Sequence, residues 1–224
     1  MAEQKAGKLI IFNMENFENN RFSNLPGSQD VETLQSTFRK FNCDVKDVHK
    51  DLTKDELKKE IEKISKSNFQ DYKYLAIAIL THGHRQGMMV VNDCKLINLD
   101  THVILPILRN RSLANKPKLF IVDACKGGFD LLSAHTDAKP FFDEPIIGNT
   151  LRCYATTEGF KACATEDGGS VFTAEFCKFL ENEGKEKSVE DIMKLTIKTL
   201  QKKYFQVPSY ETNMTDPFIL GDYI

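Results

Sequence analysis

Short runs of consecutive apolar residues recur along the chain. Runs of this kind are typical of β-strands that are covered on both faces of a sheet. The predicted strands are 9–12, 42–48, 74–80, 88–91, 118–123 and 151–156, with a last strand at 218–220. Of the first three, 74–80 has the most buried-looking pattern, because all seven of its residues are apolar.

The segments between these runs carry apolar residues at every third or fourth position, which predicts helices. Ser28 is placed to cap a helix that buries Leu34 and Phe38. Thr53 and Glu56 have the spacing of a capping box that opens a second helix. Further helices are expected over 99–111, 170–182 and 188–204. Strands that alternate with helices predict an α/β fold, with a mostly parallel sheet covered by helices on both faces.

Length and composition bound the class of protein. The chain has 224 residues, of which 41% are hydrophobic and 28% charged, as in a globular domain, and we expect one domain over 1–224. The net charge is −2 and the basic residues are scattered, so no nucleic-acid partner is predicted. No stretch approaches the roughly 18 apolar residues of a spanning helix, so no membrane span is expected either.

Six cysteines are distributed mostly within the apolar runs. They form no CxxC pair, and the chain is too long to need disulfides for its stability. We expect free thiols in the reducing cytoplasm. No cluster of cysteine and histidine has the spacing of zinc ligands, so no metal or other cofactor is predicted.

Two reactive side chains follow two of the most apolar strands. His82 comes just after 74–80 and Cys125 just after 118–123. Active sites of parallel sheets lie at the carboxyl ends of the strands. If the two strands are neighbours, His82 can deprotonate Cys125, and the amides of Gly83 and Cys125 can bind an oxyanion. The pattern alone leaves open that Cys125 is a buried structural thiol and His82 a loop histidine.

The sequence around these residues resembles the caspase family. Thr81-His82-Gly83 and the segment 116–127, which ends in Asp-Ala-Cys-Lys-Gly, are similar to the histidine and cysteine motifs of caspases. The gap between His82 and Cys125 is compatible with the roughly 50 residues expected in that family. The likeness continues through 154–159, 167–172 and 206–208, so it covers nearly the whole chain in order.

This resemblance implies a three-layer sandwich around a six-stranded sheet, with paired catalytic units. It implies His82 as general base and acid, Cys125 as nucleophile, and the amides of Gly83 and Cys125 as the oxyanion hole. Because the chain begins close to its first strand, the layout is similar to that of an effector-type member or an excised catalytic domain.

The residues that would bind a substrate aspartate differ from the caspase pattern. Caspases hold that carboxylate with a glutamine two residues before the cysteine and with two arginines. Here the glutamine position is Asp123, one arginine position is Ala164, and only Arg21 lies near the other. A buried carboxylate without a cation is costly, and Asp123 would repel it, so efficient cleavage after aspartate is not expected. The neighbouring subsites also lack tryptophan, which is absent from the chain.

Two interpretations of Asp123 stay open. Its carboxylate can face the pocket and select a basic residue, which resembles the more distant metacaspases. Alternatively, its carboxylate pairs with a neighbouring lysine, or it only makes polar a pocket that no longer binds a substrate side chain.

The loop after the nucleophile resembles the segment where caspases are cut into two subunits. Asp137, followed by a small residue, is the expected processing site, with Asp130 and Asp143 as alternatives. Residues 1–137 would then be the large-subunit region and 138–224 the small-subunit region. An aspartate-specific caspase acting in trans would make this cut.

Two functions follow from these features. The first is a caspase-like cysteine endopeptidase of apoptosis-type signalling that acts on protein or peptide substrates with a non-standard specificity. The second is a catalytically impaired decoy that pairs with a paralogous caspase and regulates it. The intact Cys125 and His82 favour the first function, and the altered aspartate pocket favours the second. Both imply a homodimer or a heterodimer.

Overall fold

The structure is a computed structural model that describes residues 5–19, 21–127, 148–165 and 168–224. The strands are β1 (Gly7–Asn13), β2 (Cys43–Lys50), β3 (Tyr74–Leu80), β4 (Met88–Val90), β5 (Leu96–Asn98), β6 (Lys118–Asp123), β7 (Thr150–Tyr154) and β8 (Ser209–Thr212). The α-helices are α1 (Ser28–Arg39), α2 (Lys54–Lys66), α3 (Leu105–Leu108), α4 (Val171–Glu183) and α5 (Val189–Tyr204). Short 3₁₀ or π turns occupy Arg85–Gly87, Asp100–Ile104, Arg111–Leu113 and Leu220–Tyr223.

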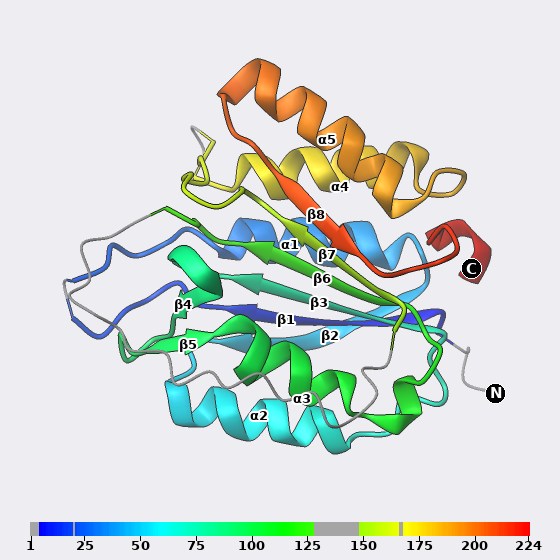
Figure 1. Ribbon diagram of the computed structural model, residues 1–224, viewed down its shortest axis with the longest axis horizontal. Helices are drawn as coiled ribbons and strands as arrows, with labels where there is room; N and C mark the ends of the chain where they lie inside the picture. Colours follow the sequence, from blue (N-terminus) through cyan, green and yellow to red (C-terminus); the bar gives the residue numbers. More distant parts are fainter. Residues whose placement is uncertain (1–4, 20, 128–147, 166–167) are drawn as a thin grey trace.

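Six strands form one twisted sheet in the order β2-β1-β3-β6-β7-β8 (Figure 1). The pairs from β2 to β7 are parallel, and only β8 runs antiparallel to its neighbour. The strands β4 and β5 make a separate two-stranded hairpin. The predicted α/β fold, a mostly parallel six-stranded sheet between two layers of helices, is therefore confirmed.

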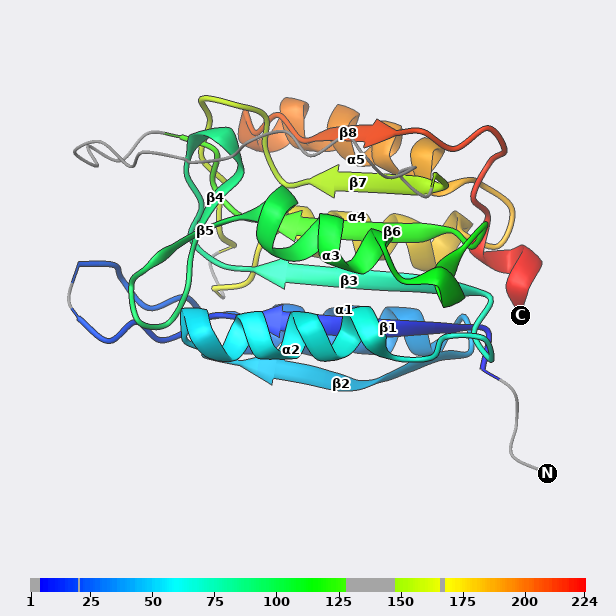
Figure 2. The same cartoon turned by 60° about the horizontal axis from the view of Figure 1, so that its bottom comes forward.

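Helices cover both faces of the sheet, as Figure 2 shows with α2 and α3 in front and α1, α4 and α5 behind. One buried cluster joins the sheet to α1, α4 and α5, and a second joins it to α2, α3 and the β4–β5 hairpin. The sequence of β3 is continuously apolar because both faces of this strand are buried. Ala76 and Ala78 belong to the first cluster, whereas Ile77 and Ile79 belong to the second.

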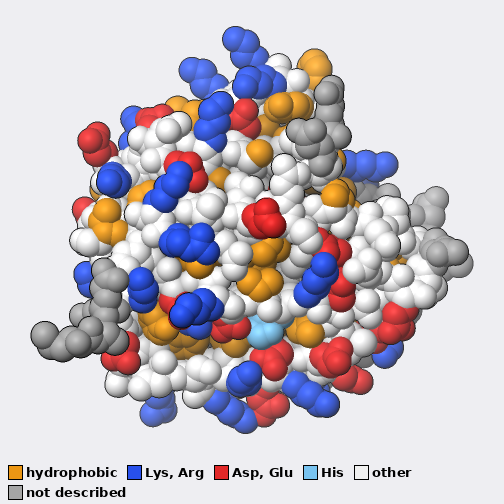
Figure 3. All heavy atoms as spheres, turned by 180° about the vertical axis from the view of Figure 1, so that it is seen from behind, with side chains coloured by type: hydrophobic (Ala, Val, Ile, Leu, Met, Phe, Trp, Pro, Cys, Tyr) orange, Lys and Arg blue, Asp and Glu red, His pale blue; other side chains and the backbone are white. Residues whose placement is uncertain are grey.

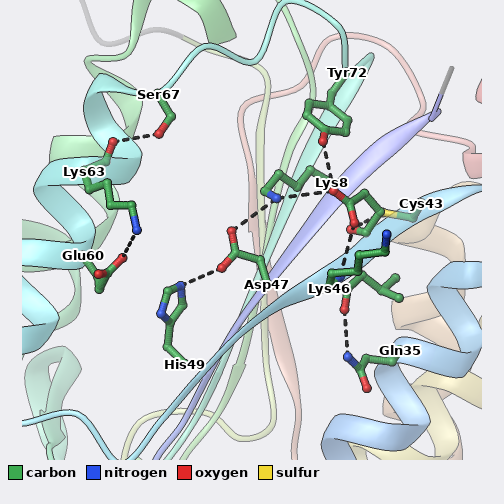
Figure 4. Close-up of polar contacts among 12 residues, drawn as sticks. Lys8, Gln35, Cys43, Lys46, Asp47, His49, Glu60, Lys63, Ser67 and Tyr72 are labelled. Carbon is green, nitrogen blue, oxygen red and sulfur yellow. Dashed lines mark hydrogen bonds and ion pairs between the residues drawn. The ribbon is translucent and has the colours of Figure 1, made fainter. Parts of the chain in front are cut away.

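The edge strand β2 is covered by charged side chains that contact β1 (Figure 4). The Lys8 ammonium lies 3.2 Å from a carboxylate oxygen of Asp47, and Asp47 also binds the imidazole of His49 at 2.9 Å. The His49 ring stacks on Phe12, with centroids 4.9 Å apart. Charged side chains on an edge strand disfavour pairing with a second sheet, so this edge is protected.

Three details of the expected secondary structure differ from the observed structure. Gly27 precedes α1, and the Ser28 hydroxyl donates to Glu15 instead of capping the helix. The region 99–111 is not one helix, because a π turn, the four-residue α3 and a 3₁₀ turn share it. The expected last strand at 218–220 is wrong, since the edge strand is β8 and Phe218 packs into the core. The capping box of Thr53 and Glu56 is confirmed.

The surface carries charges of both signs. Figure 3 shows basic and acidic side chains interspersed over one face, with small apolar areas between them. All six cysteines are unpaired. Among the described helices, none has the length and apolar character that crossing a membrane requires.

Candidate active site

The carboxyl ends of three neighbouring strands meet at one edge of the sheet. In the strand register, Asn13 of β1 is aligned with Leu80 of β3, and Leu80 is aligned with Asp123 of β6. His82 and Cys125 each lie two residues beyond this aligned row, so adjacent strands carry them to the same edge. The condition that the two strands be neighbours is therefore met.

The His82 imidazole is oriented by a backbone carbonyl. Its Nε2 atom lies 2.7 Å from the carbonyl oxygen of Ser23, which can only accept a hydrogen bond. Nε2 therefore carries the proton in the neutral ring, and Nδ1 is the nitrogen that can take a further proton. The rings of Phe17 and Phe22 pack against the imidazole at centroid distances of 4.9 and 5.6 Å.

The Cys125 thiol is partly buried beside a backbone amide. Burial raises its pKa above the ordinary value, and the nearby Asp123 carboxylate also raises it, whereas the Ala162 amide lowers it. That amide donates to Sγ at 3.3 Å. A thiol with a raised pKa is mostly protonated at neutral pH, so it depends on a base such as His82 to become a nucleophile.

Gln206 fixes the segment that supplies this amide. Its Oε1 accepts from the Cys163 amide at 2.7 Å, and its Nε2 donates to the Ala155 carbonyl at 2.7 Å. Gln206 is buried. The side chain thus joins the end of β7 to the residues that line the candidate site on one side of Cys125.

Gly83 packs directly against the backbone of Cys125. A Cβ atom at this position would lie 2.2 Å from the Cys125 carbonyl oxygen. The β-bridge between Gly83 and Met89 uses the His84 amide and the His82 carbonyl, so it does not engage the Gly83 amide. Within the described part of the chain, the amides of Gly83 and Cys125 donate no hydrogen bond. Both are available to an oxyanion.

A pocket of about 210 Å³ opens beside Cys125 and His82. Asp123 and Ala164 line it, as does Asp30 of α1, but Arg21 does not. Arg21 is exposed in the loop before α1, and its amide donates to Asn19. No lysine or arginine stands among the described residues that line the pocket.

Two carboxyl groups share the floor of this pocket. Asp123 accepts a hydrogen bond from the Thr173 hydroxyl at 2.6 Å, and Asp30 accepts from the Ser170 amide at 2.9 Å. Burial raises the pKa of Asp123. Burial, together with the charge of Asp123, raises the pKa of Asp30 to about 7. The pocket is therefore acidic, and near neutral pH Asp30 can be protonated or ionised.

The raised pKa of Asp30 makes stability depend on pH. Its ordinary value is 3.8 and its folded value about 7, so between these values the folded state binds more protons than the unfolded state. The stabilisation is complete below about pH 4 and is lost as the pH rises to about 7. We expect urea unfolding at a series of pH values to show this decline in the free energy of unfolding, at about 1.4 kcal/mol per pH unit at most. Asp30→Asn should flatten it, and an unchanged slope would contradict the assignment.

Sequence reasoning missed several residues of this site. Asp30 lies in the first turn of a helix, where acidic residues are common on the surface, and nothing in the sequence distinguishes a buried one. The Ser23 carbonyl is a backbone group that every residue carries. The residue type at this position therefore does not indicate that it binds His82. The expected processing site, Asp137, lies outside the described residues.

A mostly parallel α/β sheet with a histidine and a cysteine at adjoining strand ends is the architecture of a class of cysteine peptidases. A sequence profile described as the Caspase domain matches residues 6–219. The chain belongs to the caspase family.

Similar proteins are consistent with this membership. Caspase-7 of Gallus gallus is 25% identical over 230 residues, which cover 97% of this chain and 72% of that protein. Caspase-1 of Spodoptera frugiperda is 27% identical over 224 residues, which cover 96% and 72%. A crystal structure of the Spodoptera frugiperda caspase-1 matches with a TM-score of 0.78 at 22% identity, covering 97% of this chain and 90% of that chain. The chain is therefore similar to caspases in its fold as well as in its sequence.

Proposed function

We propose that the protein is a cysteine endopeptidase that does not cleave efficiently after aspartate. The observation that carries this proposal is the pairing of β3 with β6, which brings His82, oriented by the Ser23 carbonyl, to the same edge as Cys125. Membership of the caspase family supports the same chemistry.

The geometry supports the following reaction. His82 takes the thiol proton on Nδ1 while Sγ of Cys125 attacks the peptide carbonyl, and the amides of Gly83 and Cys125 stabilise the oxyanion. The C–N bond then breaks as His82 returns the proton to the leaving amine. Water, deprotonated by His82, attacks the thioester carbonyl, and the thiol is released with the new carboxylic acid.

The charge of the pocket supports the specificity. A substrate aspartate would enter beside two carboxyl groups, Asp30 and Asp123, without a basic residue among the described lining. Like charges in a desolvated site cost several kcal/mol. Asp123 instead favours a cationic or neutral residue before the scissile bond.

Peptide-library profiling tests this function. We expect turnover by the wild-type protein and none by Cys125→Ala, with Cys94→Ala as a control thiol that does not line the pocket. Peptides with aspartate before the cut should be turned over at least about 30-fold more slowly than the preferred ones. Cleavage after aspartate at a rate near the best substrate would contradict the specificity, and turnover by Cys125→Ala would contradict the mechanism.

A second candidate function is a decoy that regulates a paralogous caspase. The raised pKa of the Cys125 thiol favours it, because such a thiol is a weak nucleophile unless a base activates it. The edge strand β8 offers a surface for pairing, either with a second copy or with the paralogue. Absence of turnover, together with a changed rate of a related caspase on mixing, would select this function.

The cellular setting is part of the same proposal. We place the protein in apoptosis-type proteolytic signalling in the cytoplasm, where its six unpaired thiols would stay reduced. Its partners are protein or peptide substrates. Cleavage at Asp137 by an aspartate-specific caspase would separate 1–137 from 138–224, and an Asp137→Ala variant that resists this cleavage tests it.

A further inference from the structure

Gln206 is a buried polar side chain to which the proposed reaction assigns no role. It is 1% exposed and lies between two backbone segments. Its oxygen accepts from the Cys163 amide and its nitrogen donates to the Ala155 carbonyl, each at 2.7 Å. Because the side-chain amide has one acceptor end and one donor end, these two contacts fix its orientation. Gln206 is therefore a defined bridge between the two segments.

This bridge connects Cys125 to the strand that precedes it. The Ala155 amide donates to the Val122 carbonyl of β6 at 2.9 Å, so Ala155 is fixed to the sheet. Cys125 follows the end of β6 by two residues. At the other end of the bridge, Cys163 is adjacent to Ala162, whose amide lies 3.3 Å from Cys125 Sγ. The bridge therefore fixes the Ala162 amide relative to the strand that carries the thiol.

Backbone hydrogen bonds hold the same segment. The Lys126 amide donates to the Phe160 carbonyl at 3.0 Å. The Val171 amide donates to the Cys163 carbonyl at 3.3 Å. Gln206 differs from both because it acts through its side chain. A substitution at this position removes its contribution and leaves the backbone groups in place, so the role of Gln206 can be tested.

A backbone amide that donates to sulfur stabilises the thiolate relative to the thiol. A hydrogen bond to the charged form of a group favours that form, and a charged acceptor makes the stronger bond. Burial raises the pKa of the Cys125 thiol, whereas the Ala162 amide lowers it. The thiolate is the nucleophilic form of cysteine. The position of this amide therefore affects how much of Cys125 can react.

We propose that Gln206 is a positioning residue that holds the Ala162 amide against Cys125 Sγ, where the amide stabilises the thiolate. Gln206 does not stand among the described residues that line the pocket, so it acts through the backbone of 162–163. The amide bond to sulfur weakens once Sγ has attacked the peptide carbonyl, because the negative charge then lies on the oxyanion. The inference rests on the proposed function, to which it adds a residue outside the pocket.

Other charged or titratable groups surround the Cys125 thiol. They are His82 after β3, Asp123 at the end of β6, Asp30 of α1, and Lys161 and Cys163 of the neighbouring segment. Lys161 requires a control of its own. Its charge lowers the thiol pKa, and its backbone belongs to the segment that Gln206 holds. A displaced segment would move this charge together with the Ala162 amide.

The pH dependence of alkylation by iodoacetamide tests the role of Gln206 without a substrate. The rate is followed by mass spectrometry of the peptide that contains Cys125. Gln206→Met keeps nearly the same volume and removes both hydrogen bonds, and it should raise the midpoint of the Cys125 rate by about one pH unit. Gln201→Met, at an exposed position of α5, should keep the wild-type midpoint. The rate at Cys94 in the same samples should not change.

The direction of this change separates positioning from simple loosening. A segment that only opened would expose the thiol to water, and the midpoint would fall because burial raises the thiol pKa. In turnover assays, Gln206→Met should lose about tenfold in kcat/KM at neutral pH and recover above the new midpoint. A structural defect would lower kcat/KM equally at every pH. The upward shift should persist in a Lys161→Gln background.

Nuclear magnetic resonance of the wild-type protein tests the contact directly. The chemical shift of the Ala162 amide proton should titrate with the same midpoint as alkylation of Cys125. Cys125→Ser should abolish this titration. The measurement leaves Gln206 in place, so it remains decisive if Gln206→Met does not fold.

Three results would overturn the inference. The first is an unchanged or lowered midpoint in folded Gln206→Met protein. The second is an Ala162 amide that does not titrate with Cys125. The third is a shift that disappears in the Lys161→Gln background, which would assign the effect to the lysine charge. A raised midpoint without turnover by the wild-type protein would instead refute the proposed function and support the role of Gln206.

Discussion

Gly83→Ala is expected to lower kcat for peptide cleavage by about 10²–10³-fold, the loss typical of removing one oxyanion donor. The added Cβ would lie 2.2 Å from the Cys125 carbonyl oxygen and 2.8 Å from the Ala124 Cβ. Contacts this short force the two backbones apart. The Gly83 amide and the nucleophile then no longer approach one carbonyl group, while substrate binding in the neighbouring pocket is less affected. The change should therefore appear in kcat more than in KM.

Gly148→Ala is the matched control for this substitution. A Cβ at position 148 would meet no atom of the described residues within 4 Å, so the same chemical change should leave kcat at the wild-type value. Circular dichroism at the assay temperature verifies that each variant is folded. A folded Gly83→Ala protein with wild-type kcat would remove Gly83 from the oxyanion hole.

The positions of His82 and Cys125 could be predicted because the strands before them are buried on both faces. A strand of that kind is a continuous apolar run, and the first polar residues after it mark the carboxyl end. The two apolar runs, one followed by a histidine and the other by a cysteine, can be recognised in the sequence without knowing which strands contact each other. The caspase motifs then supplied the pairing of these strands, which spacing alone leaves open.

The composition of the pocket could not be predicted in the same way. Asp30 belongs to the first turn of α1, and whether such a residue is exposed depends on the rotation of the helix against α4. Ser28 illustrates the same limit, because its hydroxyl bonds Glu15 of the preceding loop instead of an α1 amide. Asn13 follows the expected strand 9–12 but is the last residue of β1, and its buried side-chain oxygen lies against Gly27 of a later segment. Such contacts between distant segments follow from packing and leave no local pattern.

For Arg21, closeness in sequence to Gly27 and Ser28 did not predict a position in the pocket. It precedes Gly27 and Ser28 closely enough to be a candidate for the pocket, yet it is exposed and the pocket lining does not include it. The loop before α1 instead contributes the Ser23 carbonyl and two aromatic rings to the surroundings of His82. This loop therefore surrounds His82, and its last residues, Leu25 to Gly27, also line the pocket.

Phe176→Ala is expected to lower the free energy of unfolding by about 3–5 kcal/mol, as is typical of a fully buried aromatic residue. Phe176 is 0% exposed in the core between the sheet and α4, and its ring stacks on Phe172 with centroids 5.8 Å apart. The same helix carries Thr173, whose hydroxyl binds Asp123. The cavity left by the ring would therefore loosen the helix that supports the floor of the pocket.

Urea unfolding of Phe176→Ala and of the control Phe205→Ala measures this effect. Phe205 is 87% exposed, so its truncation should change the free energy of unfolding by no more than about 0.5 kcal/mol. The two variants lose the same ring, and their difference isolates the contribution of burial. Equal midpoints at unchanged m-values would show that α4 does not pack on the sheet in the folded state. The acidic pocket would then lose its physical basis, because the groups that bind Asp123 and Asp30 come from this helix and its cap.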